Sequence, residues 1–353
     1  MSCALVLRVA GAGATTSVGL DLASSAAAIR AAVDNFQETR FLDRFGEPLL
    51  GAAMPLVLPG DADGSRTGGS ERFALALTLA IEECLANAQV KLPLPASVPL
   101  LMLGDDTRSG PMLETAYAMH RQCAGFFAQP ERLHMQAFTG GESSCIAALE
   151  AARAFIGGGA PCVLIAGVDS WLNVPDVHSG LKHDRLLSTA QSAGFIPGEA
   201  AAAILVQAET AASKGAALLL RGLGMAEESA TLLADEPCSG KGLAQAIQRA
   251  LRDAGMQAHE MHARLTDAAG EEYFFDEAAY AWARVLRQPL PPGYQYLQPA
   301  TRVGHVGAAF GPLLIGYLWH LARVNRLCGP NALVHLSSVQ PARGALVLSH
   351  RTH

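Results

Sequence analysis

The sequence contains few charged residues and no long uninterrupted apolar run. Only 16% of its 353 residues are charged and 50% are hydrophobic, which predicts a large core and favours burial of some surface in an oligomer. No stretch reaches the roughly 18 apolar residues of a membrane span, so we expect no membrane insertion. The net charge of −6 disfavours nucleic-acid binding, because nucleic-acid-binding domains are usually basic.

The sequence also lacks the patterns that hold disulfides, metals and nucleotides. Its seven cysteines are scattered with no CxxC pair, which predicts reduced thiols in a cytoplasmic protein. The N-terminus has no basic n-region, and Arg8 interrupts its apolar run, so we expect no secretory signal. Gly11 and Gly13 follow a predicted strand over 4–10 and form its closing turn, but the remaining glycines of a dinucleotide fingerprint are absent. We therefore expect neither a cofactor nor a metal.

One stretch, residues 138–170, organises the rest of the chain. It predicts a strand end, a Gly-Gly turn, a helix over 143–156 and a second strand. The helix has almost no polar face, and a helix that is apolar all round is buried. The turn should therefore direct Glu142, Ser143 and Ser144 into the interior of the protein.

Strands and helices alternate along both halves of the chain, which is typical of a mixed α/β protein. A second apolar helical segment, residues 303–321, mirrors the first. Two sheets that enclose two buried helices would satisfy both segments, so we predict a five-layer α/β/α/β/α sandwich made of two pseudo-duplicated halves, residues 1–210 and 215–353. The remaining expected helices cover 20–33, 71–88, 111–123, 242–254 and 277–286, and the remaining strands cover 98–103, 133–138, 163–166, 200–206, 218–223, 262–266, 332–336 and 345–348.

Three segments resemble motifs of the β-ketoacyl-[acyl carrier protein] synthases, the condensing enzymes of the thiolase-like superfamily. They are GAPCVLIAGVDS at 159–170, GFIPGEAAAAILV at 194–206 and GHVGAA at 304–309. The resemblance covers most of the chain and implies the thiolase-like fold, an acyltransferase family and a setting like that of fatty acid or polyketide biosynthesis.

The resemblance implies a nucleophilic cysteine at the start of the buried helix, where the helix dipole lowers the thiol pKa. The ungapped match places Glu142 at that position. Cys145 lies three residues later, nearly one turn beyond the elbow, and buried cysteines are more often inert packing residues. A carboxylate beside a helix N-terminus is also electrostatically favourable without any catalytic role.

The other residues of the implied catalytic set are mostly replaced. Ala269 stands where the family has its first histidine, and His305 corresponds to the second. Ala300 replaces a lysine, and residues 337–345 replace the glycine-rich loop that borders the active site. His305 is either a buried structural histidine or a partner of Glu142, if the two buried helices begin side by side.

These losses together predict a homologue that no longer catalyses condensation and acts as a scaffold or partner subunit, although they leave open whether the chain is an enzyme. The resemblance implies a homodimer or a heterodimer with a related protein, with an acyl carrier protein or acyl-CoA as a candidate ligand. One alternative is an active acyltransferase, decarboxylase or thioesterase, in which Glu142 and His305 form a general-base pair and Ser143 or Ser144 is the nucleophile. A protein-binding or chaperone-like module is another. The acidic turn that contains Asp267, Glu271 and Glu272 should be solvated.

Overall fold

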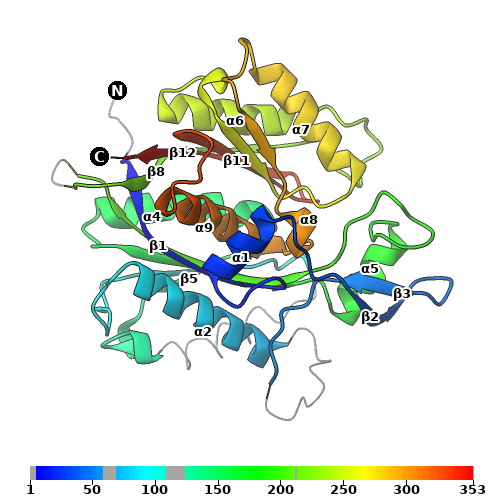
Figure 1. Ribbon diagram of the computed structural model, residues 1–353, viewed down its shortest axis with the longest axis horizontal. Coiled ribbons are helices and arrows are strands. Elements are labelled where there is room, and N and C mark those ends of the chain that lie inside the picture. Colours follow the sequence, from blue (N-terminus) through cyan, green and yellow to red (C-terminus); the bar gives the residue numbers. More distant parts are fainter. Residues whose placement is uncertain (1–4, 59–68, 109–123, 211–212, 353) are drawn as a thin grey trace.

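The computed structural model describes residues 5–58, 69–108, 124–210 and 213–352, and they form two packed half-sheets with helices between and outside them (Figure 1). The strands of the first half are β1 (Leu7–Thr16), β4 (Leu100–Leu103), β5 (Met135–Phe138), β6 (Val163–Ser170) and β7 (Glu199–Ala208). Those of the second half are β8 (Ala217–Glu227), β9 (Ala263–Thr266), β10 (Gln295–Leu297), β11 (Asn331–Ser337) and β12 (Ala342–Arg351).

The two halves repeat one topology, as the predicted duplication requires. The strand order is β5-β4-β6-β7-β1 in the first half and β10-β9-β11-β12-β8 in the second. Read in this order, the first two pairings of each half are parallel and the last two are antiparallel. The sequence predicts two separate sheets, whereas residues 7–9 of β1 pair with residues 218–220 of β8 and join the halves into one sheet. This short pairing satisfies backbone groups at one end of each strand that would otherwise lie at an open edge.

Two buried helices lie between the half-sheets, as expected from their apolar sequences. They are α4 (Ser144–Gly157) and α9 (Phe310–Arg323), and Figure 1 shows them in the middle layer. The outer layers contain α2 (Ser70–Asn87) on one side and α6 (Lys241–Ala254) with α7 (Glu272–Val285) on the other. The shorter helices are α1 (Leu22–Arg30), α5 (Val174–Lys182) and α8 (Ala300–Val303).

The first strand is longer than the sequence predicts. A turn is expected at Gly11 and Gly13, but β1 continues through both to Thr16. A Cβ at Gly11 would lie 2.4 Å from the Cys84 carbonyl oxygen, and one at Gly13 would lie 2.2 Å from that of Ala80. These glycines therefore let α2 pack directly on the strand, and the turn prediction was wrong.

Several elements were not expected or cannot be compared. The hairpin of β2 (Gln37–Leu42) and β3 (Pro48–Gly51) was missed, as were α5 and β10. The helix expected over 111–123 lies outside the described residues.

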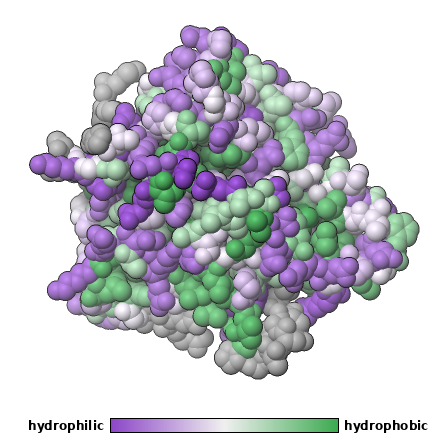
Figure 2. All heavy atoms as spheres, viewed as in Figure 1, coloured by the Kyte–Doolittle hydropathy of each residue, from purple (hydrophilic) through white to green (hydrophobic). Residues whose placement is uncertain are grey.

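Figure 2 shows hydrophobic residues gathered on the side where the hairpin and α5 project. Among the described helices, none combines the length and apolarity needed to cross a membrane.

The two buried helices pack tightly against each other at Gly311. A Cβ added there would lie 2.3 Å from Cβ of Cys145 and 2.6 Å from its sulfur. We expect Gly311→Ala to lower the unfolding free energy by about 1–3 kcal/mol through overpacking, measured by urea denaturation. Gly316→Ala on the same helix is the control, because its Cβ would meet only side-chain atoms at 3.3–3.6 Å. Equal stability of the two variants would contradict this packing.

A buried histidine on β11 predicts a pH-dependent stability. The His335 side chain is 1% exposed, and among the described residues neither ring nitrogen has a hydrogen-bond partner. Burial and the nearby Arg264 hold the pKa of His335 well below its ordinary value. The Tyr296 ring stacks on the imidazole at 6.5 Å. The folded protein therefore keeps His335 neutral.

We expect His335→Leu to weaken the loss of stability on acidification. Below the ordinary histidine pKa of about 6.5, the unfolded chain binds a proton that folded His335 does not. Neutral His335 therefore costs no stability above that pH. Below it, the unfolding free energy falls by up to about 1.4 kcal/mol per pH unit. Urea denaturation at several pH values from about 7.5 to 5 measures the difference between the two proteins. A constant difference across this range would contradict the prediction.

Candidate functional site

The elbow before α4 places Glu142 inside the protein. After β5 the chain turns at Gly140 and Gly141 into the short 3-10 helix η3 (Gly141–Ser143), which runs directly into α4. Gly141 has φ of +64°, a left-handed conformation that favours glycine. Glu142 follows it and is only 5% exposed. The predicted elbow is thus present, with its first side chains directed inward.

The carboxylate of Glu142 contacts the imidazole of His305. Oε1 of Glu142 lies 3.1 Å from Nε2 of His305. The His305 backbone is held by two hydrogen bonds, since its N–H donates to the Ile196 carbonyl at 2.8 Å and its carbonyl accepts from Gly198 at 3.0 Å. The segments that lead into the two buried helices therefore lie side by side, which is the condition that the sequence analysis set for a contact between Glu142 and His305.

Aromatic rings enclose the imidazole of His305. Its centroid lies 4.7 Å from that of Phe195, 5.1 Å from that of Trp171 and 5.7 Å from that of Phe310. Nδ1 of His305 has no hydrogen-bond partner among the described residues. Packing and the bond to Glu142 thus fix the orientation of the ring.

The pair decides the charge of Glu142. Burial by itself raises the pKa of this carboxyl group, but the hydrogen bond from His305, the charge of His305 and the more distant Arg108 together hold the pKa of Glu142 below its ordinary value. The group is therefore ionised at neutral pH. This answers a question that the sequence leaves open, namely whether burial or the histidine dominates.

Arg108 connects three aspartates beside the pair. Its guanidinium lies 3.1 Å from Asp105 and 3.0 Å from Asp176, and it also contacts Asp169. The same group lies 4.1 Å above the ring of Trp171. The three carboxylates outweigh burial and raise the pKa of Arg108. The sequence analysis missed this cluster, because Arg108 is separated from two of its partners by more than sixty residues.

Asp169 has a second role at the start of the helical segment that leads into α9. Its Oδ2 accepts a hydrogen bond from the Ala308 N–H at 2.9 Å. Gly307 has φ of +49°, and a Cβ there would lie 2.0 Å from that same oxygen. Asp169 therefore links β6 to the turn that carries His305.

The acidic turn expected to be solvated is partly buried, so that expectation was wrong. Glu271 is 5% exposed and accepts hydrogen bonds from Arg185 at 2.8 and 2.9 Å. Asp267 is 3% exposed and accepts from the Ser337 N–H at 2.9 Å. Burial, together with the charge of Glu142, raises the pKa of Asp267 well above its ordinary value. The turn is buried because Arg185 and the backbone of β11 supply partners; Glu272 alone of the three is exposed.

Ala269 lies in this same turn, partly buried against the core and against the cluster that contains Trp171 and Phe195. Its methyl group offers neither a donor nor an acceptor. Ala300, at the position expected for a lysine, is 3% exposed at the start of α8. Both positions therefore contribute packing at the places where the resemblance expects polar groups.

The serines and the cysteine after Glu142 are engaged elsewhere. The Ser143 hydroxyl donates to the Gly140 carbonyl at 3.2 Å, and that of Ser144 donates to the Gly141 carbonyl at 2.6 Å. Cys145 is fully buried against Gly311, and burial raises its thiol pKa to about 12. A nucleophilic role of either serine remains a prediction, whereas the environment of Cys145 disfavours its thiolate.

A pocket of about 210 Å³ reaches Glu142 from the surface. Its walls include Arg108, Trp171 and Arg185, and the turn Ser338–Gln340 forms one side. This turn joins β11 to β12 and occupies the position of the expected glycine-rich loop. The described lining contains Glu142 and lacks His305, so the histidine lies behind the carboxylate. No group of three or more potential metal ligands occurs in the part of the chain that the structure describes.

Neither a family model nor a curated protein matches the sequence. The arrangement of the two half-sheets, the two buried helices and the elbow defines the thiolase-like ketosynthase fold, and solved structures bear this out. The ishigamide ketosynthase/chain length factor superposes with a TM-score of 0.70 and 19% identity, covering 98% of this chain and 99% of that one. A β-ketoacyl synthase from Burkholderia phymatum gives 0.73 and 16%, covering 98% and 100%.

A third solved structure contains a partner protein. It is the type II polyketide acyl carrier protein in complex with its ketosynthase (AntDE and AntF), with a TM-score of 0.74, 15% identity, and coverage of 98% of this chain and 99% of that one. The predicted fold is thereby confirmed. The roles of Glu142, His305, Ala269, Ser143 and Ser144 remain predictions, because identities this low establish the fold alone.

Proposed function

We propose that this chain is a ketosynthase-like partner subunit that does not form carbon–carbon bonds. The observation that carries the proposal is the contact of Glu142 Oε1 with His305 Nε2 at 3.1 Å. The carboxylate of Glu142 lies at the start of α4, where the resemblance implies a thiol. It also engages Nε2 of His305, which is then not free to bind a substrate. Carboxylates do serve as nucleophiles in some enzymes, but an acyl group on Glu142 would be a mixed anhydride and could not replace the thioester of a condensing enzyme. Ala269 stands at the position that the resemblance gives to the family's first histidine.

The proposal is tested with small acyl thioesters. Purified protein is incubated with acetyl-CoA and malonyl-CoA, and intact mass, thioester cleavage and CO₂ release are measured. We expect no covalent adduct and no turnover above buffer, for the wild type and for Glu142→Cys. Turnover that Glu142→Gln and His305→Ala both abolish, and that Ser179→Ala on the pocket wall preserves, would overturn the proposal.

The open pocket at Glu142 supports a second candidate, an acyltransferase, decarboxylase or thioesterase for acyl thioesters. A sealed pocket would have argued against such an enzyme, whereas about 210 Å³ is accessible beside the ionised carboxylate. In this case Glu142 would be the general base and His305 would position it. The same assay distinguishes the two candidates, since only the enzyme consumes the thioester. A rate that falls on acidification as Glu142 is protonated would support the second candidate.

The edge strand near the elbow is the surface we propose for a partner subunit, either a second copy or a related protein. β5 pairs with β4 on one side, and the described residues supply no strand on the other. The Leu100 N–H donates to the His134 carbonyl, and the Gly104 N–H donates to that of Phe138. In a parallel ladder this register directs the N–H of Ala137 outward. The neighbours solved as complexes support a partner role, and exposed edge strands pair readily with other chains.

We expect Ala137→Pro to weaken this association at least about tenfold, because proline removes an outward donor without disturbing the β4 ladder. Mass photometry measures the dimer fraction, alone and mixed with an active condensing enzyme of the same organism. Ala137→Val is the control, since it keeps the N–H and a side chain that suits a strand. Circular dichroism checks that both variants fold. A dimer as tight in the proline variant as in the wild type would contradict the proposed surface.

A further inference from the structure

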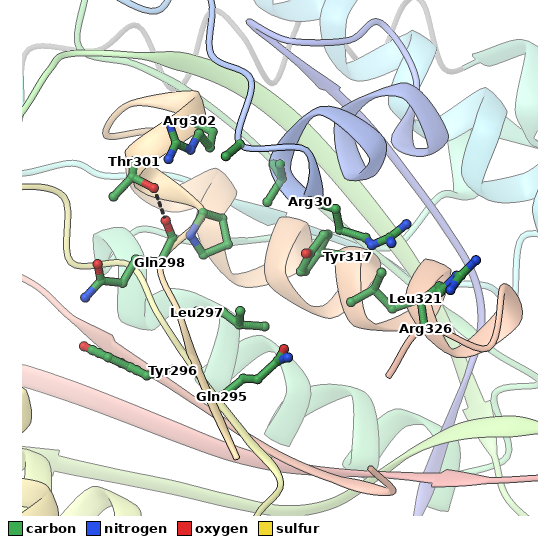
Figure 3. A pocket seen from close by; sticks show the side chains of 13 residues that line it. Arg30, Gln295, Tyr296, Leu297, Gln298, Thr301, Arg302, Tyr317, Leu321 and Arg326 are labelled. Atoms are coloured by element: carbon green, nitrogen blue, oxygen red, sulfur yellow. Dashed lines mark hydrogen bonds between the residues drawn. The ribbon is translucent and has the colours of Figure 1, made fainter. Parts of the chain in front are cut away.

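A second and larger cavity lies away from the pocket at Glu142. Its volume is about 470 Å³, and it lies between the end of α1, strand β10, helix α8 and the C-terminal part of α9 (Figure 3). It shares no lining residue with the pocket at Glu142. Any ligand in this cavity would therefore be bound independently of the function proposed above.

The cavity is cationic although the protein is acidic. Arg30, Arg302 and Arg326 line it, and its described lining contains no aspartate or glutamate. The chain as a whole has a net charge of −6, so three arginines around one cavity run against the overall balance. Arg302 donates one N–H to Asp34 at 3.2 Å, which leaves its other donors free to contact a ligand. Within the described structure, the side chains of Arg30 and Arg326 form no hydrogen bond or ion pair with another residue.

The ends of the two helices do not account for these arginines. A cation near a helix C-terminus can bind its last carbonyl groups. Backbone N–H groups already bond to carbonyls at these helix ends. The Ala27 carbonyl accepts from the Ala31 N–H at 2.9 Å, and the Leu321 carbonyl accepts from the Arg326 N–H at 2.8 Å. The guanidinium groups of Arg30 and Arg326 are therefore available for an external anion.

The cavity has a cationic group at each end and a mixed wall between them. Arg30 and Arg326 extend at one end, and Arg302 lies at the other with Thr301 and Gln298 (Figure 3). Leu297 lies on the β10 wall beside Gln295, and the ring of Tyr317 lies beside Arg30. Burial raises the pKa of Tyr317 to about 12, so its hydroxyl is a neutral hydrogen-bond donor.

We propose that this cavity binds a small organic phosphate. Two unpaired guanidinium groups offer the planar pairs of donors that match phosphate oxygens. Arg30 and Arg326 would hold the phosphate, and Leu297 and the ring of Tyr317 would contact the body of the ligand. Arg302 would bind a polar group at the far end. A cavity of this volume falls in the range of small-molecule sites.

The test uses phenyl phosphate, with phenol as the uncharged probe and inorganic phosphate as the probe without a body, in titration calorimetry. We expect phenyl phosphate to bind more tightly than inorganic phosphate and phenol not to bind. The double variant Arg30→Gln/Arg326→Gln should weaken binding at least about tenfold, because charge-assisted hydrogen bonds are lost. Arg323→Gln should leave it unchanged, since Arg323 lies outside the cavity, over the ring of Trp319 at 4.8 Å.

Three results would overturn the proposal. They are no binding of phenyl phosphate at millimolar concentration, equal binding of phenol, and affinity unchanged in the double variant. Because neither arginine side chain that the double variant replaces bonds to another described residue, we expect the variant to fold, and its urea denaturation midpoint checks this. The thioester assay does not involve this cavity, so its outcome and this one are independent.

Discussion

Arg108→Met is expected to lower the unfolding free energy by about 3–5 kcal/mol, because it leaves buried carboxylates without their cation. The guanidinium is 12% exposed and pairs with Asp105, Asp169 and Asp176. Methionine fills similar space but cannot neutralise three negative groups. Asp169 also accepts from the Ala308 N–H, so repulsion among the aspartates should disturb the turn that carries His305.

Urea denaturation near pH 7 measures the loss, and acidification identifies its cause. The deficit of Arg108→Met should shrink as the pH is lowered toward about 4, because protonated aspartic acids repel one another less. Arg44→Met is the matched control. Arg44 pairs with Asp184 at 3.7 Å, and both side chains are 60% exposed, so its loss should cost at most about 1 kcal/mol. Equal losses in the two variants would show that the cluster around Arg108 has no special weight.

Arg343→Met should be destabilising to a similar extent, about 3–5 kcal/mol. Arg343 and Glu277 form an ion pair at 2.7 Å in which both side chains are fully buried. Arg343 also donates to the carbonyls of Ser338 and Gln340 at 2.8 and 2.6 Å. Burial raises the pKa of Glu277, and Arg343 opposes that rise. The variant would leave a buried carboxylate without a cation and a turn without its donor.

The double variant Arg343→Met/Glu277→Leu separates these two effects. Removing both charges should restore part of the stability, because a buried ion pair replaced by apolar groups is often close to neutral. The remaining deficit would report the unpaired carbonyls of the turn. A double-mutant cycle in urea measures the coupling. Strictly additive losses would contradict a direct pairing of Arg343 with Glu277.

Much of the architecture was predictable from local sequence patterns. The apolar sequences of 143–156 and 303–321 leave no polar face for solvent, so both helices had to be buried whatever their surroundings. The apolar runs that became β6, β7 and β11 were equally clear. Errors arose where a residue has two uses: Gly11 and Gly13 favour a turn locally, but here they let α2 approach β1.

The candidate site was predictable only in part. The sequence identified Glu142 at the elbow and His305 in its motif, and it named their contact as a condition on the fold. It gave no sign of the cluster around Arg108, and it placed Asp267 and Glu271 in solvent. A charged residue carries no local signal of its partner, because the partner can lie anywhere in the chain.

The sequence alone determined the layered α/β sandwich, the two buried helices and the place of Glu142 at the elbow before the first of them, because these depend on local periodicity and on motif positions. Only the tertiary structure decided the chemical state of the site. It brings His305 to 3.1 Å from Glu142, and that contact outweighs burial and keeps the carboxylate ionised. It also collects Arg30, Arg302 and Arg326 around one cavity, because α1, α8 and α9 meet only when the chain is folded.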